Sequence, residues 1–380
     1  MGQEYVIETQ DLCFRYKGSK RMSVDGVNIK IRKGTKTAIL GANGAGKSTL
    51  FFHFNGIFKP VSGSVLYNGE KIEYSKKALS QLRSDVTVVL QNPDDQIFSA
   101  TVEEDVAFGP INLNLPRDEV EKRVNDALFC VGMTSYRNVP VSQLSYGQKK
   151  RIAFAGALAM KPKVLVLDEP TAGLDPQMSL EIMEIADQLH HTGTTVIIST
   201  HDVDLAYSWA DEIHVLRRGK LIHSGGQEEF YSDRVNVYLS GLVPPSVYGI
   251  NDGLGTLRGG PVAPYPRTTS QLLSKIRPED KRTGTLFLSP VKQGSDLSNA
   301  GARGEEVDIG IYGMEARKLA YDAGIRAEYV FNALENCLIE CVLGNDAILC
   351  FDAELEDSVL GAVERLKEFG AEIHTGKIEL

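Results

Sequence analysis

The fold of this chain is decided by the stretch Gly41-Ala42-Asn43-Gly44-Ala45-Gly46-Lys47-Ser48-Thr49, a complete G-x-x-x-x-G-K-[ST] phosphate loop. The strand-like run 36–40 precedes the loop, and the run 50–54, which can be helical, follows it. In this setting backbone N–H groups and a helix N-terminus point at phosphate oxygens. We therefore expect all nine residues to bind a nucleotide, with Lys47 beside its outer phosphates and Ser48 holding Mg²⁺.

Length and composition describe an ordinary globular protein. The chain has 380 residues, 42% of them hydrophobic and 24% charged, and is long enough for two or three domains. Its longest apolar runs, such as 164–167, are far shorter than the roughly 20 residues that span a bilayer. A net charge of −9 argues against a nucleic-acid partner. Five cysteines, an odd number, and no visible signal peptide favour the cytoplasm.

The pattern of the chain predicts an α/β protein with two domains. Residues 1–240 alternate strand and helix signals and predict a P-loop NTPase domain, with an N-terminal antiparallel β subdomain and a helical insertion from about 92 to 160. Residues 241–282 are rich in Gly and Pro without clear periodicity, so we expect a linker. Residues 283–380 predict a small α/β domain with a regulatory or dimerising role.

Two acidic residues follow a continuous apolar run. The run 164–167 is typical of a strand buried on both faces, and it ends in Asp168 and Glu169. A carboxylate at such a strand end beside a phosphate loop can hold Mg²⁺ through water, and we assign this role to Asp168. Glu169 would then act as general base on the attacking water, a role worth roughly 10²–10⁴-fold in rate. Two solvated acids at a strand end are the alternative.

The segment Leu144-Ser145-Tyr146-Gly147-Gln148 stands at the start of a predicted helix. Here the chain resembles, over residues 4–240, the ATP-binding subunits of ABC transporters, whose signature is Leu-Ser-Gly-Gly-Gln. The resemblance implies that Ser145, Gly147 and Gln148 contact the ATP of the opposite subunit, with the helix N-terminus favouring an anion. Tyr146 departs from the family pattern, and its effect is open.

Further motifs of the same family follow in order. The resemblance implies that Gln91 reaches Mg²⁺, that Leu174 and Asp175 contact the opposite subunit, and that His201 orients the catalytic carboxylate. It also implies that Tyr16 stacks on adenine. Without the family context, a lone His at a strand end is more often structural, and a lone Tyr more often packs in the core.

The resemblance implies an ATPase that needs ATP, Mg²⁺ and a second ATPase copy. One copy's signature closes over ATP held by the other copy's phosphate loop, and this chain contains one of each. A homodimer is the simpler expectation, and a paralogous partner is the alternative.

The stretches 91–98, 101–109 and 144–151 look like the cobalt/nickel importer and energy-coupling-factor (ECF) branch of the family. In that branch the region receives a coupling helix of the transmembrane subunits, and Asp94 and Asp95 would pair with its arginines. The alternative is a solvated acidic turn. We therefore expect a peripheral ATPase on the cytoplasmic face of the membrane, energising cobalt or nickel import. A vitamin-importing ECF complex, or a soluble ABC ATPase acting on nucleic acid or ribosomes, are the rival hypotheses.

No family resemblance covers residues 283–380. Cys337 and Cys341 are four apart and would share one helix face, with Cys350 and His374 further on. A soft-metal or cobalt-sensing site is one interpretation of these residues. Cysteines packed as small apolar side chains are the other, because Leu338, Ile339 and Val342 lie between them.

Overall fold

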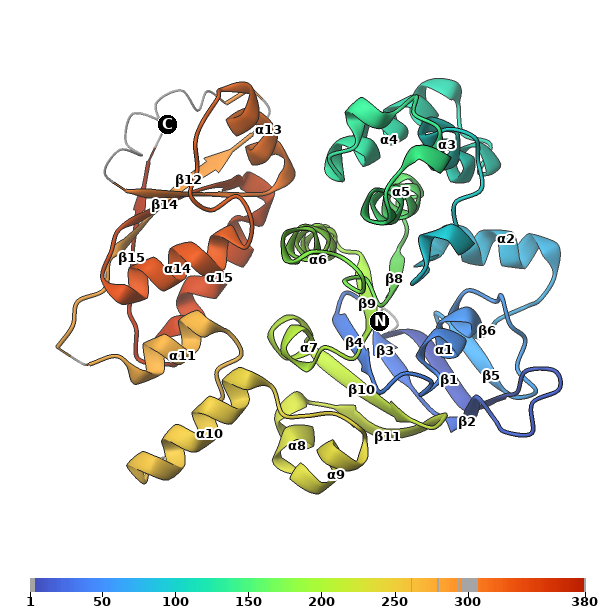
Figure 1. The fold of residues 1–380 in the computed structure, drawn as a ribbon, viewed down its shortest axis with the longest axis horizontal. Coiled ribbons are helices and arrows are strands. Elements are labelled where there is room, and N and C mark those ends of the chain that lie inside the picture. Colours follow the sequence, from blue (N-terminus) through green and yellow to red (C-terminus); the bar gives the residue numbers. More distant parts are fainter. Residues whose placement is uncertain (1–3, 261, 279, 293, 296–306, 379–380) are drawn as a thin grey trace. The chain divides into compact units, whose positions relative to one another are not determined.

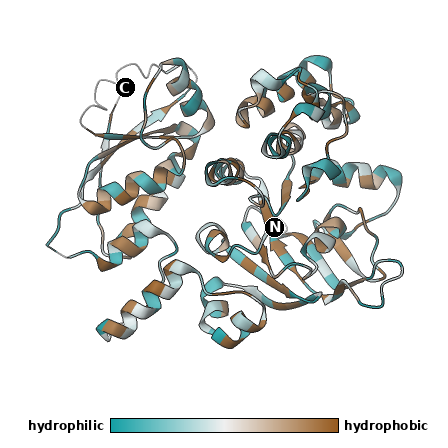
Figure 2. Ribbon diagram, viewed as in Figure 1, coloured by the Kyte–Doolittle hydropathy of each residue, from teal (hydrophilic) through white to brown (hydrophobic). Residues whose placement is uncertain are grey.

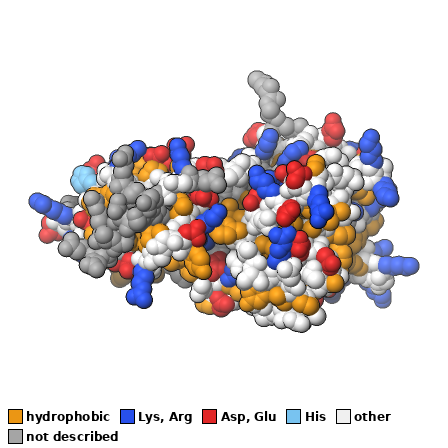
Figure 3. All heavy atoms as spheres, turned by 90° about the horizontal axis from the view of Figure 1, so that it is seen from above, with side chains coloured by type: hydrophobic (Ala, Val, Ile, Leu, Met, Phe, Trp, Pro, Cys, Tyr) orange, Lys and Arg blue, Asp and Glu red, His pale blue; other side chains and the backbone are white. Residues whose placement is uncertain are grey.

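The computed structural model describes residues 4–260, 262–278, 280–292, 294–295 and 307–378. The chain forms two compact units, Met1–Pro244 and Pro245–Leu380, and each is described by itself (Figure 1). Lys, Arg, Asp and Glu side chains are interspersed over the face shown in Figure 3. Among the described residues, the structure has no helix that is long and apolar enough to cross a bilayer.

A mixed sheet of six strands forms the centre of the first unit, in the order β11-β10-β4-β9-β8-β7. Its strands are β4 (Lys36–Leu40), β7 (Val86–Val89), β8 (Val164–Asp168), β9 (Thr195–Thr200), β10 (Glu212–Arg217) and β11 (Lys220–Gly225). All pairs are parallel except β10 with β11. β8 and β9 are buried along their whole length, which explains their hydrophobic character in Figure 2. The carboxyl ends of β4, β8 and β9 therefore meet at one edge of the sheet.

An antiparallel sheet accompanies the first one, as the sequence predicts. It contains β1 (Tyr5–Phe14), β2 (Val24–Val27), β3 (Lys30–Arg32), β5 (Ser62–Tyr67) and β6 (Glu70–Lys71). Residues of α1 (Lys47–Phe54) contribute to the core cluster shared by strands of both sheets: Leu50, Phe51 and Phe54 are fully buried there. Burial of these side chains is what holds the phosphate loop, which precedes α1, against the sheet.

The helical insertion lies between β7 and β8. After α2 (Lys76–Asp85), which leads into β7, the insertion comprises α3 (Val102–Asn112), α4 (Arg117–Cys130) and α5 (Tyr146–Ala159), which pack on one another (Figure 1). α3 and α5 each begin with a capping box, Thr101 with Glu104 and Ser145 with Gln148. The chain then forms α6 (Pro176–His191), α7 (Val203–Trp209), α8 (Gln227–Ser232) and α9 (Arg234–Leu239). The predicted P-loop NTPase fold is confirmed.

The second unit contains a parallel sheet in the order β13-β14-β12-β15. Its elements are β12 (Thr285–Val291), β13 (Asp308–Tyr312), α13 (Met314–Asp322), α14 (Ala333–Leu343), β14 (Ala347–Asp352), α15 (Glu356–Lys367) and β15 (His374–Lys377). One core cluster joins the sheet to α14 and α15, and a second joins it to α13. The small α/β arrangement therefore has helices on both faces of its sheet.

The expectation of an irregular linker over residues 241–282 is wrong. This stretch contains two helices, α10 (Ser246–Arg258) and α11 (Thr269–Ile276). α11 packs against α14 and α15, and the carboxylate of Glu335 accepts hydrogen bonds from the backbone N and Oγ of Ser270 at the start of α11. Glycines in α10 have low helix propensity and hide the helix in the sequence.

The proposed cysteine site is not formed. Cys337 and Cys341 lie in the core cluster between the sheet and α14, whereas Cys350 lies in the cluster on the α13 side. His374 is exposed on β15. Burial raises the pKa of the Cys350 thiol to about 12, so it is a poor source of the thiolate that binds soft metals. Among the described residues, no group of three His, Cys, Asp or Glu side chains could hold a metal ion.

Candidate active site

The phosphate loop turns from β4 into α1. Gly46 adopts a φ of 108°, and a Cβ there would collide with the carbonyl oxygen of Ser23, so this position requires glycine. α1 begins at Lys47, which places Ser48 and Thr49 in its first turn with the helix N-terminus facing the loop. The Lys47 ammonium donates to the carbonyl of Gly41 at 2.6 Å, which folds its side chain back over the loop.

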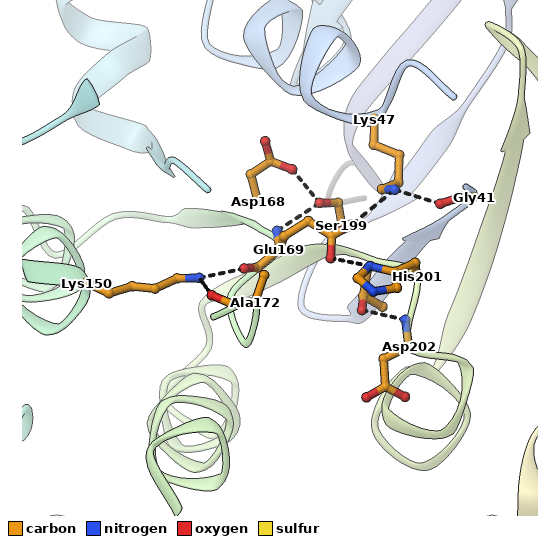
Figure 4. Close-up of polar contacts among 10 residues, drawn as sticks. Gly41, Lys47, Lys150, Asp168, Glu169, Ala172, Ser199, His201 and Asp202 are labelled. Atoms are coloured by element: carbon orange, nitrogen blue, oxygen red, sulfur yellow. Dashed lines mark hydrogen bonds and ion pairs between the residues drawn. The ribbon is translucent and has the colours of Figure 1, made fainter. Parts of the chain in front are cut away.

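Glu169 lies between a lysine and a histidine (Figure 4). Its Oε1 is 3.1 Å from Nζ of Lys47, and its Oε2 is 2.9 Å from Nδ1 of His201. Glu169 and Lys47 are buried, which strengthens their electrostatic interaction. The backbone of Glu169 has a φ of 47°, and its N–H donates to Oγ and O of Ser199 on β9. Neighbouring strands therefore hold this residue in an uncommon conformation that aims its carboxylate at the phosphate loop.

Asp168 is buried at the end of β8. It accepts a hydrogen bond from the hydroxyl of Ser199. Burial raises the pKa of the Asp168 carboxyl, and hydrogen bonds from Ser199 and Ser48 partly offset that effect. A carboxylate next to a serine hydroxyl is a set of hard oxygen donors that suits Mg²⁺. The residues present therefore fit the predicted magnesium site. For Gln91, the contact that the structure shows is made by its backbone carbonyl, which accepts a hydrogen bond from the Tyr146 hydroxyl.

Two polar residues of this site are missing from the sequence-based prediction. Ser199 holds Asp168 and the backbone of Glu169, as described above. Lys150 of α5 is 1% exposed, and its ammonium donates to the carbonyls of Glu169 at 2.8 Å and Ala172 at 2.9 Å (Figure 4). Burial lowers the pKa of Lys150 to about 8, and the nearby charges of Glu169 and Asp168 act in the opposite direction. The only sequence signal is a basic run, 149–151, which does not indicate which of its members points inward.

Tyr16 lies beside the phosphate loop. Its hydroxyl is 3.0 Å from Oγ1 of Thr49, and its ring meets Phe14 and Phe58 edge to face. The side chain remains 42% exposed, so part of the aromatic side chain is accessible next to the loop. This placement is compatible with stacking on adenine, which stays a prediction.

The signature residues lie at the start of α5. Ser145 is the N-cap, its Oγ accepts from the N–H of Gln148, and the Gln148 side chain accepts from the N–H of Ser145. A Cβ on Gly147 would lie 2.9 Å from the Met178 thioether of α6, so the signature packs tightly there. Asp175, in the loop after β8, caps α6 by accepting from the N–H of Met178 at 2.8 Å. The signature thus packs against Met178 and Leu174, and its Tyr146 hydroxyl donates to the carbonyl of Gln91.

The acidic turn after β7 carries Asp94 and Asp95. Asp94 is 2.6 Å from Nζ of Lys149, and Asp95 accepts a hydrogen bond from the side-chain amide of Asn92. Nearby, the rings of Phe98 and Phe108 meet edge to face at 4.6 Å, and the two residues are 65% and 47% exposed. The sequence-based prediction lacks this exposed aromatic pair, which adds apolar surface to the acidic turn.

Known proteins resemble this chain over the same region. The ABC transporter family profile matches residues 24–172. An energy-coupling factor transporter ATP-binding protein, EcfA, of Methanocaldococcus jannaschii is 53% identical and is matched over 87% of its length and 64% of this chain. EcfA2 of Methanospirillum hungatei is 36% identical over 91% of this chain and 89% of its own. The second similarity extends well into the second unit.

Solved structures of ATP-binding cassettes resemble this chain as well. The structure of cbiO1 from Clostridium perfringens, described as part of the ABC transporter complex cbiONQ, has a TM-score of 0.56 and 41% identity, covering 67% of this chain and 99% of that one. A dimeric ATP-binding cassette in a post-hydrolysis state with ADP and Pi has a TM-score of 0.53 and 27% identity, covering 57% and 97%. This chain therefore belongs to the ABC transporter ATPases, the ATP-binding and ATP-hydrolysing subunits of these transporters, in their energy-coupling-factor branch.

Proposed function

We propose that Glu169 is the general base of ATP hydrolysis in this chain. The observation that carries this role is its position between Lys47 and His201, with carboxylate oxygens 3.1 Å and 2.9 Å from their nitrogens. Lys47 would turn to the outer phosphates of ATP, and His201 would then hold the carboxylate in the orientation that accepts a proton from water. A general base must lie within hydrogen-bond reach of that water, and the position of Glu169 at the end of β8, beside the phosphate-loop lysine, supports this role.

The remaining site residues bind and orient the nucleotide. The loop residues Gly41, Ala42, Asn43, Gly44, Ala45, Gly46, Ser48 and Thr49 surround the phosphates, while Tyr16 faces the adenine. Ser48, Asp168 and Gln91 would hold Mg²⁺, whose charge neutralises the phosphate oxygens. The oxygen donors at the end of β8 and in the first turn of α1 support this assignment.

Two copies of the chain would form the complete ATPase. Ser145, Gly147 and Gln148 of one copy bind the ATP held by the other copy, with Leu174 and Asp175 beside that contact. The support is that the signature starts α5 next to the loop of Asp175, where its helix N-terminus can meet an incoming anion. The similar cassette that is bound to ADP and Pi is itself dimeric.

The transported solute of this importer would be cobalt or nickel ion. The ATPase would sit on the cytoplasmic face of the membrane, where Asp94 and Asp95, with Phe98 and Phe108 beside them, would receive a coupling helix of the transmembrane subunits. Closure of the ATPase pair would pull on that helix, and hydrolysis with product release would reset it. A vitamin taken up through an ECF complex is the second candidate, because relatives such as the M. jannaschii protein carry the energy-coupling-factor name.

Isolation of the chain with its partners from native membranes tests this function. The complex is extracted in mild detergent and its subunits are identified by mass spectrometry. We expect one fixed set of membrane subunits, and cellular cobalt or nickel uptake that depends on Glu169. Several interchangeable vitamin-binding subunits on one shared transmembrane protein would favour the second candidate. Absence of any membrane partner would contradict both.

A further inference from the structure

Tyr146 is the residue at which the signature departs from the family pattern. It is the first helical residue of α5, so it takes an ordinary helical backbone and its side chain adds no backbone strain. The side chain is 40% exposed and folds back toward two loops of the same unit. Replacement of a signature glycine by tyrosine therefore adds contacts at this site.

Those contacts join the signature helix to the loop after β7 and the loop after β8. The Tyr146 hydroxyl donates to the carbonyl oxygen of Gln91 at 3.3 Å. Its ring covers Gly173, where an added Cβ would lie 2.9 Å from Cε1 of the tyrosine. Gly173 also has a φ of 75°, which glycine adopts without strain. Tyr146 and Gly173 are therefore a sterically matched pair.

The next residues on the same face of α5 hold the same two loops. Lys149 is three positions after Tyr146 and pairs with Asp94, three residues beyond Gln91, at 2.6 Å. Lys150 is four positions after Tyr146 and donates to the carbonyls of Glu169 and Ala172. Side chains three and four apart lie together on a helix, so the first turns of α5 contact both loops along one stripe.

We propose that Tyr146 is a positioning residue that fixes the Gln91 loop and the Gly173 loop to the start of the signature helix. This inference rests on the proposed roles of Gln91 and the signature. Gln91 serves the copy's own ATP, while the signature serves the ATP of the second copy. Tyr146 thus makes a physical connection between the two ATP sites within one chain, and the three segments move together.

Removal of the hydroxyl alone tests the connection. Tyr146→Phe in the full-length chain keeps the ring over Gly173 and loses the bond to Gln91. We expect kcat for ATP to fall about two- to twelvefold, the factor that one neutral hydrogen bond is typically worth. KM for ATP stays within about twofold, because the phosphate loop and Tyr16 are untouched. Tyr321→Phe, a change at a tyrosine that is 86% exposed, is the matched control and leaves both constants unchanged.

Amide hydrogen exchange gives a second measurement that does not depend on turnover. In Tyr146→Phe the peptide spanning 91–97 exchanges faster than in the wild type, while the peptide spanning 41–49 is unchanged. Tyr146→Gly, which also removes the ring, extends the faster exchange to 172–175. Thermal melting checks that each variant is folded.

The possible results separate the inference from the function on which it rests. Wild-type exchange over 91–97 in Tyr146→Phe, or a KM that rises in step with any loss of kcat, overturns the role of Tyr146. If the wild-type chain itself turns over ATP and Glu169→Gln does not, the proposed site stands even when the Tyr146 inference fails. A wild-type rate in Glu169→Gln would remove the proposed site, and the assigned role of Tyr146 would fall with it.

Discussion

The ammonium of Lys47 and the carboxylate of Glu169 form a buried ion pair, with Nζ 3.1 Å from Oε1. Lys47 begins α1 and Glu169 follows β8, so the pair joins the phosphate loop to the end of a strand more than a hundred residues later. Removal of one member of a buried pair leaves an uncompensated charge, which costs more than removal of both. This relationship makes both stability and catalysis sensitive to the same two side chains.

Lys47→Met should destabilise the nucleotide-free chain through the charge that it leaves on Glu169. We expect the free energy of unfolding to fall by about 3 kcal/mol. The double variant Lys47→Met/Glu169→Gln should recover most of that loss, because the buried carboxylate is gone as well. Urea unfolding without nucleotide measures both values. A double variant less stable than Lys47→Met would contradict the buried-pair explanation.

Glu169→Gln should retain ATP binding and lose hydrolysis. The amide keeps the shape of the side chain but cannot accept the proton of the attacking water, so the rate should fall at least about 10²-fold. Phosphate release measures turnover, and a fluorescent ATP analogue measures binding. Glu73→Gln, at an exposed glutamate, is the control and should turn over ATP at the wild-type rate. A Glu169→Gln rate within tenfold of wild type would remove Glu169 from its role.

Lys150 should make the free energy of unfolding rise with pH in the alkaline range. Its folded-state pKa of about 8 lies below the 10.5 of an unfolded lysine, so between these values the unfolded chain binds more protons. Burial of the charged lysine therefore lowers the free energy of unfolding below pH 8. This destabilisation is lost as pH rises toward 10.5. We expect the wild type to gain stability relative to Lys150→Met between pH 8 and pH 10. Urea unfolding at both pH values checks the sign. If the free energies of unfolding of the wild type and of Lys150→Met change equally between the two pH values, the pKa of Lys150 is not lowered in the folded chain.

A fragment that ends at Pro244 should fold and bind ATP. Residues 1–244 form a compact unit with its own core, and every residue proposed to contact ATP lies within it. Leu242 is buried, so the cut should follow this residue. Circular dichroism and ATP binding by the purified fragment are the measurements. Loss of nucleotide binding in a folded fragment would mean that the second unit completes the site.

Asp94→Ala should weaken attachment to the transmembrane partner while the ATPase unit stays equally stable. The ion pair with Lys149 is partly exposed and worth less than about 1 kcal/mol. An arginine of a docking helix would instead lose a charge-assisted hydrogen bond in a closed interface. Recovery of membrane subunits with the tagged variant measures the effect. Full recovery would leave Asp94 as a solvated surface acid.

Several parts of the fold could be predicted because their signals are local. The strand-to-helix turn at the phosphate loop, the start of α5 at the signature, and the apolar strand β8 all depend on residues a few positions apart. The helices α10 and α11 escaped prediction because glycines and prolines dominate their surroundings, and α11 gains its stability by packing on α14 and α15.

The cysteines of the second unit illustrate a different limit. Alternation along β14 already places Leu349 and Phe351 on one face of the sheet, opposite Ile348 and Cys350. Sequence spacing alone did not show that α14 covers the face away from Cys350. The side on which a helix packs is set by the path of the chain, which a spacing between cysteines does not contain.

The sequence by itself determined the chemistry of the phosphate loop and the family of the protein. The reason is that the phosphate loop, residues 41–49, and the capped start of the signature helix are each formed by residues that are adjacent in the chain. Only the tertiary structure decided that Lys150 reaches the carbonyl of Glu169, that Tyr146 covers Gly173, and that Glu169 lies between Lys47 and His201. The physical reason is that these contacts join segments brought together by sheet order and helix packing. Burial then gives their charges and hydrogen bonds a strength that sequence separation cannot reveal.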